Sequence, residues 1–207
     1  MKRINCKSNN TSNFISAWQS DNLQLYDKII DFFEEEKDEH KLGGFGFNQT
    51  NKEYKNTTDI SVRPYQLNDS KYAFLKDYIA DIDIFYKDYR KQWEFFGKNI
   101  PILHAGTFNI QKYEIGGHVK RWHTERDSIS SAHRILAWIT YLNDVEDDGE
   151  TEFLHYDLKI KPKKGKTVIW PAEWTHAHRG NPTSSIKYAV TGWLTLPNHE
   201  RNNNSNE

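Results

Sequence analysis

The first hundred residues place apolar side chains at a helical period. Asp21 is a suitable N-cap, and the acidic run at 34–39 would end the segment in solvent. The apolar residues between them recur at helical spacing: Leu23, Tyr26, Ile30 and Phe33. This pattern predicts an amphipathic helix.

A second amphipathic helix is predicted to begin at Asp69 or Ser70. Gly97 is a stop signal, and Pro101 supports an end at that point. Its apolar stripe comprises Leu75, Tyr78, Ile82, Tyr86, Tyr89 and Trp93. We interpret both stripes as core packing.

The segments around these helices are polar and rich in turn residues. Residues 1–20 are predicted to be loose, and 43–60 to form a loop that acts as a lid and leads into a short strand at 58–62. The tail at 198–207 has the composition of a disordered segment.

After residue 103 the period changes from helical to strand-like. Short runs of β-branched and aromatic residues follow one another, separated by Gly, Asn, Asp and Pro. The predicted strands lie at 104–113, 118–125, 134–142, 151–156, 158–162, 166–171, 175–179 and 187–196. About eight strands without helices between them indicate a β-sandwich or jelly roll, so the chain is mainly β with N-terminal helices, an α+β protein.

Length and charge set further limits. A chain of 207 residues suits one domain, and a net charge of −1 gives no field that would attract nucleic acid or a membrane surface. No apolar run approaches the length of a membrane span, and Cys6 is the one cysteine. We therefore expect no nucleic-acid or membrane partner and a cytoplasmic location.

Lys187 stands in an apolar run, between Ile186 and Tyr188. A buried ammonium is costly unless an anion meets it. The anion is either an internal acid or a ligand.

His123 and Glu125 are two residues apart in a predicted strand, so both side chains project to one face. With a histidine from another strand they would form the two-histidine, one-carboxylate set of non-haem Fe(II) oxygenases. A His-x-Glu triplet alone is weak evidence. A second triplet, His155 to Asp157, lies only 23 residues before His178, and we assign it to packing or surface.

The spacing of several residues resembles that of the 2-oxoglutarate- and Fe(II)-dependent dioxygenases, and within them the prolyl hydroxylases. Lys187 follows His178 by nine residues, and Tyr113 precedes His123 by ten. "HTE" is similar to the family's HxD motif, and "HRGNPTSSIKYAVTGWL" to its segment of histidine and basic residue. "YLND…DGETEF" is similar to its middle turn, so the likeness covers roughly 104–196.

The resemblance implies a double-stranded β-helix (jelly roll) supported by the two helices, in one domain over 1–207. Residues 1–103 would supply helical support and lid, 104–197 the jelly-roll core, and 198–207 the tail. The barrel interior would be walled by Ile139, Trp170 and Val190, a choice made from strand alternation.

The resemblance also implies site residues. The Fe(II) ligands and catalytic centre would be His123, Glu125 and His178; Glu125 departs from the family's usual Asp. The co-substrate 2-oxoglutarate would contact Lys187, Tyr113, Tyr141 and Thr191, and the substrate would be bordered by Arg134 and Trp193. His176 is an alternative to His178, because both would share one face of the strand at 175–179.

The implied reaction uses O2 to hydroxylate a C–H bond and releases succinate and CO2. The leading substrate is a prolyl residue in a protein or peptide. One alternative is a non-oxidative, cupin-like metal-binding jelly roll, an isomerase or sugar-binding module, that would have no need to bury Lys187. A dioxygenase acting on nucleic acid is a third reading, disfavoured by the neutral charge.

Overall fold

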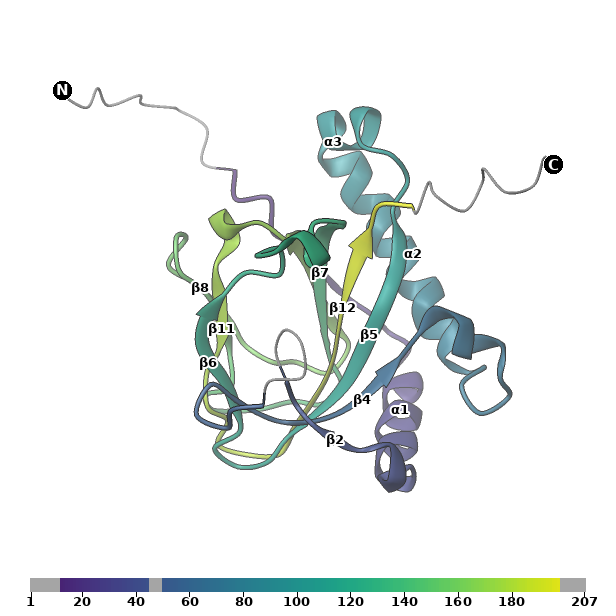
Figure 1. Ribbon diagram of the computed structural model, residues 1–207, viewed down its shortest axis with the longest axis vertical. Coiled ribbons are helices and arrows are strands. Elements are labelled where there is room, and N and C mark those ends of the chain that lie inside the picture. The colour runs from purple at the N-terminus through teal and green to yellow at the C-terminus, as the bar shows by residue number, and fades with distance from the viewer. Residues whose placement is uncertain (1–11, 45–49, 198–207) are drawn as a thin grey trace, which may run out of the picture.

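The computed structural model describes residues 12–44 and 50–197. Two antiparallel sheets face each other and enclose a barrel, and the helices lie on one side of it (Figure 1). This arrangement confirms the expected jelly roll with helical support. Cys6, the tail at 198–207 and part of the predicted lid lie outside the described residues.

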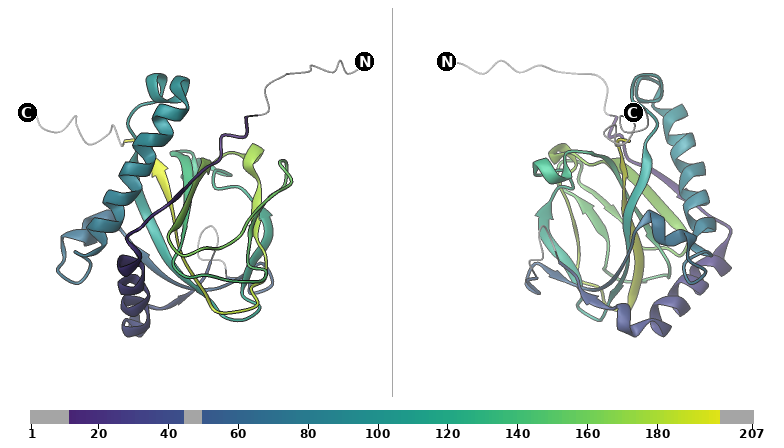
Figure 2. Two further views of the ribbon diagram at one scale, coloured as in Figure 1. Left: turned by 180° about the vertical axis from the view of Figure 1, so that it is seen from behind. Right: turned by 45° about the vertical axis from the view of Figure 1, so that its right-hand side comes forward.

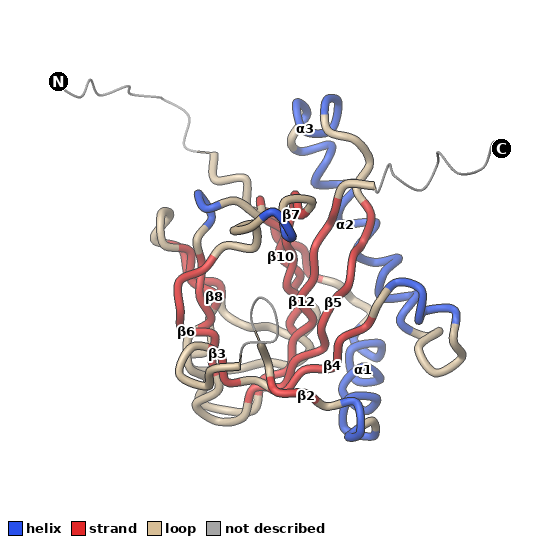
Figure 3. The backbone as a smooth tube through the Cα atoms, in the orientation of Figure 1, coloured by secondary structure: helices blue, strands red, loops and turns tan. Residues whose placement is uncertain are grey.

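The larger sheet has seven strands in the order β1-β10-β7-β12-β5-β4-β2. Their bounds are β1 Ser16–Gln19, β2 Lys41–Leu42, β4 Thr58–Val62, β5 His104–Tyr113, β7 Arg134–Tyr141, β10 Lys166–Pro171 and β12 Lys187–Thr195. The smaller sheet has the order β3-β6-β11-β8-β9. Its strands are β3 Lys55–Asn56, β6 His118–His123, β8 Thr151–Phe153, β9 Leu158–Ile160 and β11 His178–Gly180 (Figure 3).

Two long α-helices lie on the outer face of the seven-stranded sheet, and a short third helix packs on the end of the second (Figure 2). They are α1 Leu23–Glu35, α2 Leu75–Gln92 and α3 Glu94–Asn99. Four 3₁₀ turns complete the described elements: η1 Lys37–Glu39, η2 Pro64–Asn68, η3 Ile129–Ser131 and η4 Trp174–His176.

The predicted start of the second helix at Asp69 or Ser70 is wrong. The Asp69 side chain accepts a hydrogen bond from the backbone N–H of Lys71 and closes a local turn, so α2 begins at Leu75. Gly97 also does not stop the helical region, since it lies inside α3. A Cβ at Gly97 would lie 2.2 Å from the carbonyl oxygen of Arg90, so the glycine permits α3 to pack closely on α2.

Each of the eight predicted strands overlaps an observed one, but two boundaries matter for function. The run at 175–179 was expected to be one strand, whereas η4 occupies 174–176 and β11 begins at His178. β6 ends at His123, so Glu125 lies beyond the strand. The segment 16–19, expected to be loose, forms β1 and pairs with β10.

Strand alternation divides the larger sheet between two cores. On β12, Tyr188, Val190 and Leu194 pack against the helices. Ala189 and Trp193 belong to a second cluster inside the barrel, together with Ile139 and Trp170. The prediction that Val190 walls the barrel is therefore wrong, because its position in the alternation directs it to the helical side.

None of the helices in the described ranges has the length and apolar character needed to cross a membrane.

Candidate active site

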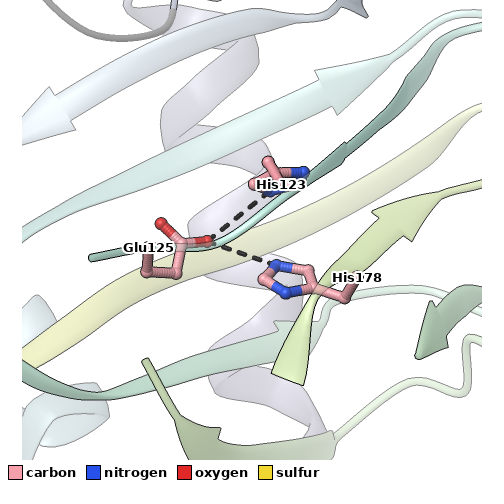
Figure 4. A group of neighbouring side chains, drawn as sticks. All are labelled: His123, Glu125 and His178. Atoms are coloured by element: carbon pink, nitrogen blue, oxygen red, sulfur yellow. Dashed lines mark ion pairs between the residues drawn. The ribbon is translucent and has the colours of Figure 1, made fainter. Parts of the chain in front are cut away.

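His123 and His178 meet where β6 pairs with β11. The two residues are direct partners in the antiparallel register, and their ring centroids are 4.3 Å apart. Glu125 follows β6 by two residues, and its side chain turns back toward both rings (Figure 4). The strand pairing thus brings together three residues that lie up to 55 positions apart in the sequence.

The donor atoms of these three side chains lie within 4.8 Å of one another, and no other such group occurs in residues 12–44 and 50–197. Glu125 Oε1 is 3.3 Å from His178 Nε2 and 3.7 Å from His123 Nε2. Ligands at right angles on an ion with bonds of about 2.1 Å would lie about 3 Å apart. A small contraction would therefore let the three atoms hold one first-row metal ion.

Both imidazoles are held in the tautomer that a metal ligand requires. His123 Nδ1 lies 2.9 Å from the carbonyl oxygen of Arg121, and His178 Nδ1 lies 3.0 Å from that of His176. A backbone carbonyl can only accept, so each Nδ1 carries the proton and each Nε2 presents its lone pair. The donor set therefore fits Fe(II), because three protein ligands would leave the other positions of an octahedral ion for co-substrate and oxygen.

The charges within the group agree with this fit. Burial acts to lower the pKa of His123, but the hydrogen bond and charge of Glu125 outweigh it and raise that pKa. Burial opposes ionisation of Glu125, yet the two histidines hold its pKa well below the usual range. Burial and the nearby His123 lower the pKa of His178. The anionic Glu125 and the neutral His178 are in the state that binds a cation, whereas a metal ion would have to displace the proton that Glu125 favours on His123.

His176 does not belong to this group. It ends η4, is 4% exposed, and its Nε2 lies 2.8 Å from the carbonyl oxygen of Asn13 and 3.2 Å from the hydroxyl of Tyr156. The premise that His176 and His178 share one strand face is wrong, because a 3₁₀ turn does not alternate its side chains. Between the two, the geometry favours His178.

The second triplet also stays outside the group. His155 is exposed and its ring packs edge-on against Trp174 at 6.2 Å. Asp157 occupies a left-handed turn position with φ 48°.

Lys187 is the first residue of β12, and its side chain is 1% exposed. Its Nζ donates to the carbonyl oxygen of Gly149 at 2.9 Å and lies 4.0 Å from the ring centroid of Tyr113. No carboxylate among the described residues forms an ion pair with it, and burial lowers its pKa to about 7 despite the attraction of Glu150. Among the described residues, the buried amine of Lys187 therefore has no anionic partner.

The other residues expected to contact 2-oxoglutarate lie on the same inner wall. Lys187 pairs with Tyr113, Ala189 with Tyr141, and Thr191 with Ile139 across neighbouring strands. Tyr113 donates to Gln111 Oε1 at 2.9 Å, and Tyr141 donates to Thr151 Oγ1 at 2.6 Å. Thr191 is partly exposed, nearer the open end.

Arg134 and Trp193, expected to border the substrate, lie beside Glu125. The Trp193 indole donates to Glu125 Oε2 at 2.7 Å. The Arg134 guanidinium lies 3.7 Å from the centroid of the Trp193 ring. Both side chains remain partly exposed at the mouth of the barrel.

The sequence-based reasoning missed a buried polar chain behind Tyr113. Gln111 Nε2 donates to Asp59 Oδ2 at 3.0 Å, and the same carboxylate pairs with Lys55 Nζ at 2.7 Å. Asp59 is 7% exposed. The sequence did contain a sign of it, because Asp59 places an acid on the inward face of the predicted strand at 58–62.

Comparisons with known proteins find similar sequences over the part of the chain that holds these residues. Residues 108–195 match the profile of the 2OG-Fe(II) oxygenase superfamily. Probable prolyl 4-hydroxylase 9 of Arabidopsis thaliana is 30% identical over 122 residues, 46% of this chain and 42% of that protein. Procollagen-lysine,2-oxoglutarate 5-dioxygenase 1 of Gallus gallus is 27% identical over 150 residues, 68% of this chain and 18% of that protein. The chain matches less than half the length of either curated relative.

Solved structures share the fold. A Pseudomonas putida prolyl-4-hydroxylase has a TM-score of 0.66 at 15% identity, covering 88% of this chain and 92% of its own. A Trichoplax adhaerens prolyl hydroxylase, in complex with a hypoxia inducible factor peptide fragment, has a TM-score of 0.73 at 12% identity over 89% and 84%. The viral collagen prolyl hydroxylase of Paramecium Bursaria Chlorella virus-1, in its 2OG complex, has a TM-score of 0.59 at 17% identity. The match covers 89% of this chain and 97% of the viral protein.

The superfamily's description names 2-oxoglutarate and Fe(II), in agreement with the expected co-substrate and metal. The three converging side chains lie within or beside strands of the matched region. On this evidence residues 108–195 are similar to the 2OG-Fe(II) oxygenase superfamily and the chain is similar in sequence to a prolyl 4-hydroxylase, while the solved structures show that it shares their fold.

Proposed function

We propose that this protein is an Fe(II)- and 2-oxoglutarate-dependent dioxygenase that hydroxylates a C–H bond, with His123, Glu125 and His178 as metal ligands. The proposal rests on one observation: the same barrel holds the three metal-ligand side chains and the buried amine of Lys187. A metal site alone would not require the amine, and a structural lysine would be expected to have an internal acid.

The protein's own residues would bind and orient the reactants. Lys187 would pair with the distal carboxylate of 2-oxoglutarate, and Tyr113 and Tyr141 would line its chain. Thr191, four residues farther along β12, would contact another part of the co-substrate. Bound Fe(II) with 2-oxoglutarate and O2 would supply the oxidation, with succinate and CO2 as products. The apolar inner wall, including Ile139 and Trp170, would keep water from the reacting atoms.

For the substrate we propose a prolyl residue in a protein or peptide. The support is the plant relative and the solved structures, whose names describe prolyl hydroxylases. A lysyl residue is the second candidate, because the relative from Gallus gallus carries the name of a procollagen-lysine dioxygenase.

The test is succinate formation with Fe(II) and 2-oxoglutarate, followed by mass spectrometry of peptides that contain proline, lysine or neither. We expect turnover that depends on both additions and on His123, and a mass gain of one oxygen on proline. His155→Ala is the matched control, because this histidine is exposed and lies outside the donor group.

Two outcomes would overturn parts of the proposal. Equal turnover by wild type and His123→Ala would refute the dioxygenase assignment, whereas oxygen only on lysine would refute the substrate. If the metal-loaded protein binds no 2-oxoglutarate, and Lys187→Ala changes nothing, the cupin-like alternative is the better description.

A further inference from the structure

The two carboxylate oxygens of Glu125 have different partners. Oε1 faces the two histidines at 3.3 and 3.7 Å. Oε2 accepts the indole N–H of Trp193 at 2.7 Å and lies 3.8 Å from Arg134 Nη1. One oxygen is thus free to meet a metal ion while the other is held by the protein.

Trp193 is itself fixed in place. The Arg134 guanidinium lies 3.7 Å from its ring centroid, and Arg134 Nη1 also donates to the backbone carbonyl of Glu125 at 3.2 Å. The pairing of β12 with β5 shifts register between Gly192 and Leu194, on either side of Trp193. Such irregularities redirect a side chain, often beside an active site.

These contacts join the two sheets at the mouth of the barrel. Glu125 follows β6 of the five-stranded sheet, whereas Trp193 belongs to β12 of the seven-stranded sheet. Because Glu125 lies outside a strand, no ladder hydrogen bond sets its direction. Its carboxylate therefore depends on side-chain partners for orientation.

We propose that Trp193, braced by Arg134, is a positioning residue that holds the Glu125 carboxylate with one oxygen toward the metal. This inference rests on the metal site of the proposed function. The proposal differs from a role in bordering the substrate, because it predicts an effect on metal binding with no substrate present.

The first test measures Mn(II) affinity by the EPR signal of the free ion, without 2-oxoglutarate or peptide. Trp193→Phe keeps an aromatic ring beside Arg134 but removes the N–H donor together with the five-membered ring that carries it. We expect its dissociation constant to rise about tenfold to a hundredfold, as for other residues that orient metal ligands. Trp174→Phe is the matched control: it makes the same change at an exposed ring and should leave the constant within about twofold of wild type.

The second test needs no metal binding by the variants. The seven tryptophan side chains each give an indole N–H signal in a ¹⁵N–¹H spectrum, and the Trp193 signal is the one absent from Trp193→Phe. In Glu125→Ala, the Trp193 signal should move more than that of any other tryptophan. A Trp193 signal that stays in place would refute the hydrogen bond.

The outcomes separate this inference from the metal site itself. If wild type binds no Mn(II), or His123→Ala binds as tightly as wild type, the proposed metal site fails. If wild type binds one Mn(II) through His123 while Trp193→Phe binds equally well, the metal site stands and the positioning role of Trp193 is wrong.

Discussion

Lys187 is the residue at which burial and chemistry conflict most. The Lys187 side chain is 1% exposed, and its ammonium contacts a carbonyl oxygen and an aromatic ring. It therefore destabilises the ligand-free protein whenever it is charged. Lys187→Met should therefore raise the free energy of unfolding by roughly 1–4 kcal/mol at pH 6. The same variant should lose measurable 2-oxoglutarate binding.

Chemical denaturation and calorimetric titration of the metal-loaded protein measure these two effects. A Lys187→Met protein that is less stable than wild type would show that the amine has an anionic partner in the ligand-free state. Retained binding of 2-oxoglutarate would instead remove Lys187 from the co-substrate site.

The pH dependence of 2-oxoglutarate binding follows from the same residue. Burial lowers the pKa of Lys187 from 10.5 to about 7, so above pH 7 the free protein holds mainly the neutral amine. A bound carboxylate would favour the charged form, and binding would then take up a proton. Affinity should be constant below about pH 7 and fall above it, by up to about tenfold per pH unit.

Titrations at saturating Mn(II) between pH 6 and 9, in two buffers of different ionisation enthalpy, would measure the affinity and the proton uptake. Lys187→Arg is the control, because arginine stays charged throughout this range and should abolish the slope. The same slope in both proteins would assign the pH dependence to another group.

At the scale of single elements, β12 serves both cores by alternation. Gly192 faces the helical side, where an added Cβ would lie 2.3 Å from Trp138 Cζ2 and 2.9 Å from Phe108 Cβ. Trp138 is fully buried and cannot move aside. Gly192→Ala should thus destabilise the protein by about 1–3 kcal/mol or more.

Urea denaturation with Gly180→Ala as the matched control would test this. A Cβ at Gly180 would meet its nearest atom at 3.5 Å, an ordinary contact, so we expect less than about 0.5 kcal/mol there. Equal stability of the two variants would contradict the packing seen around β12.

At the scale of the whole molecule, the helices support the sheet through a buried hydrogen-bond network as well as apolar contacts. Tyr78 of α2 donates to Thr140 of β7 at 3.0 Å and accepts from the Trp138 indole at 2.9 Å. Tyr78→Phe would leave the buried indole N–H without its acceptor and should destabilise the protein by about 1–3 kcal/mol.

Because Tyr78 lies on the helical side of the sheet, Mn(II) affinity of the folded variant should equal that of wild type. Tyr65→Phe, at an exposed tyrosine, is the control and should change stability little. A Tyr78→Phe protein of normal stability but weakened metal binding would show that the helices act on the site rather than on the fold.

The sequence by itself determined which segments have helical and which have strand-like periodicity, and which types of residue are available for the site. Short runs of β-branched and aromatic residues in 104–196 predicted strands that overlap those of the matched region. The spacing of His123, His178 and Lys187 carried the family resemblance that pointed to the site. These signals are local or depend on fixed separations along the chain, so they are visible without a structure. Boundaries set by side-chain hydrogen bonds, such as the turn at Asp69, were predicted wrongly.

Only the tertiary structure decided which side chains meet. The 3₁₀ turn at 174–176 removed His176 from the donor group, and the pairing of β6 with β11 placed His123 against His178. The contact of Glu125 with Trp193 joins residues 68 positions apart in two different sheets, and no periodicity along the chain encodes it. Such contacts arise when the two sheets close on each other, because only then do side chains from opposite walls share one space.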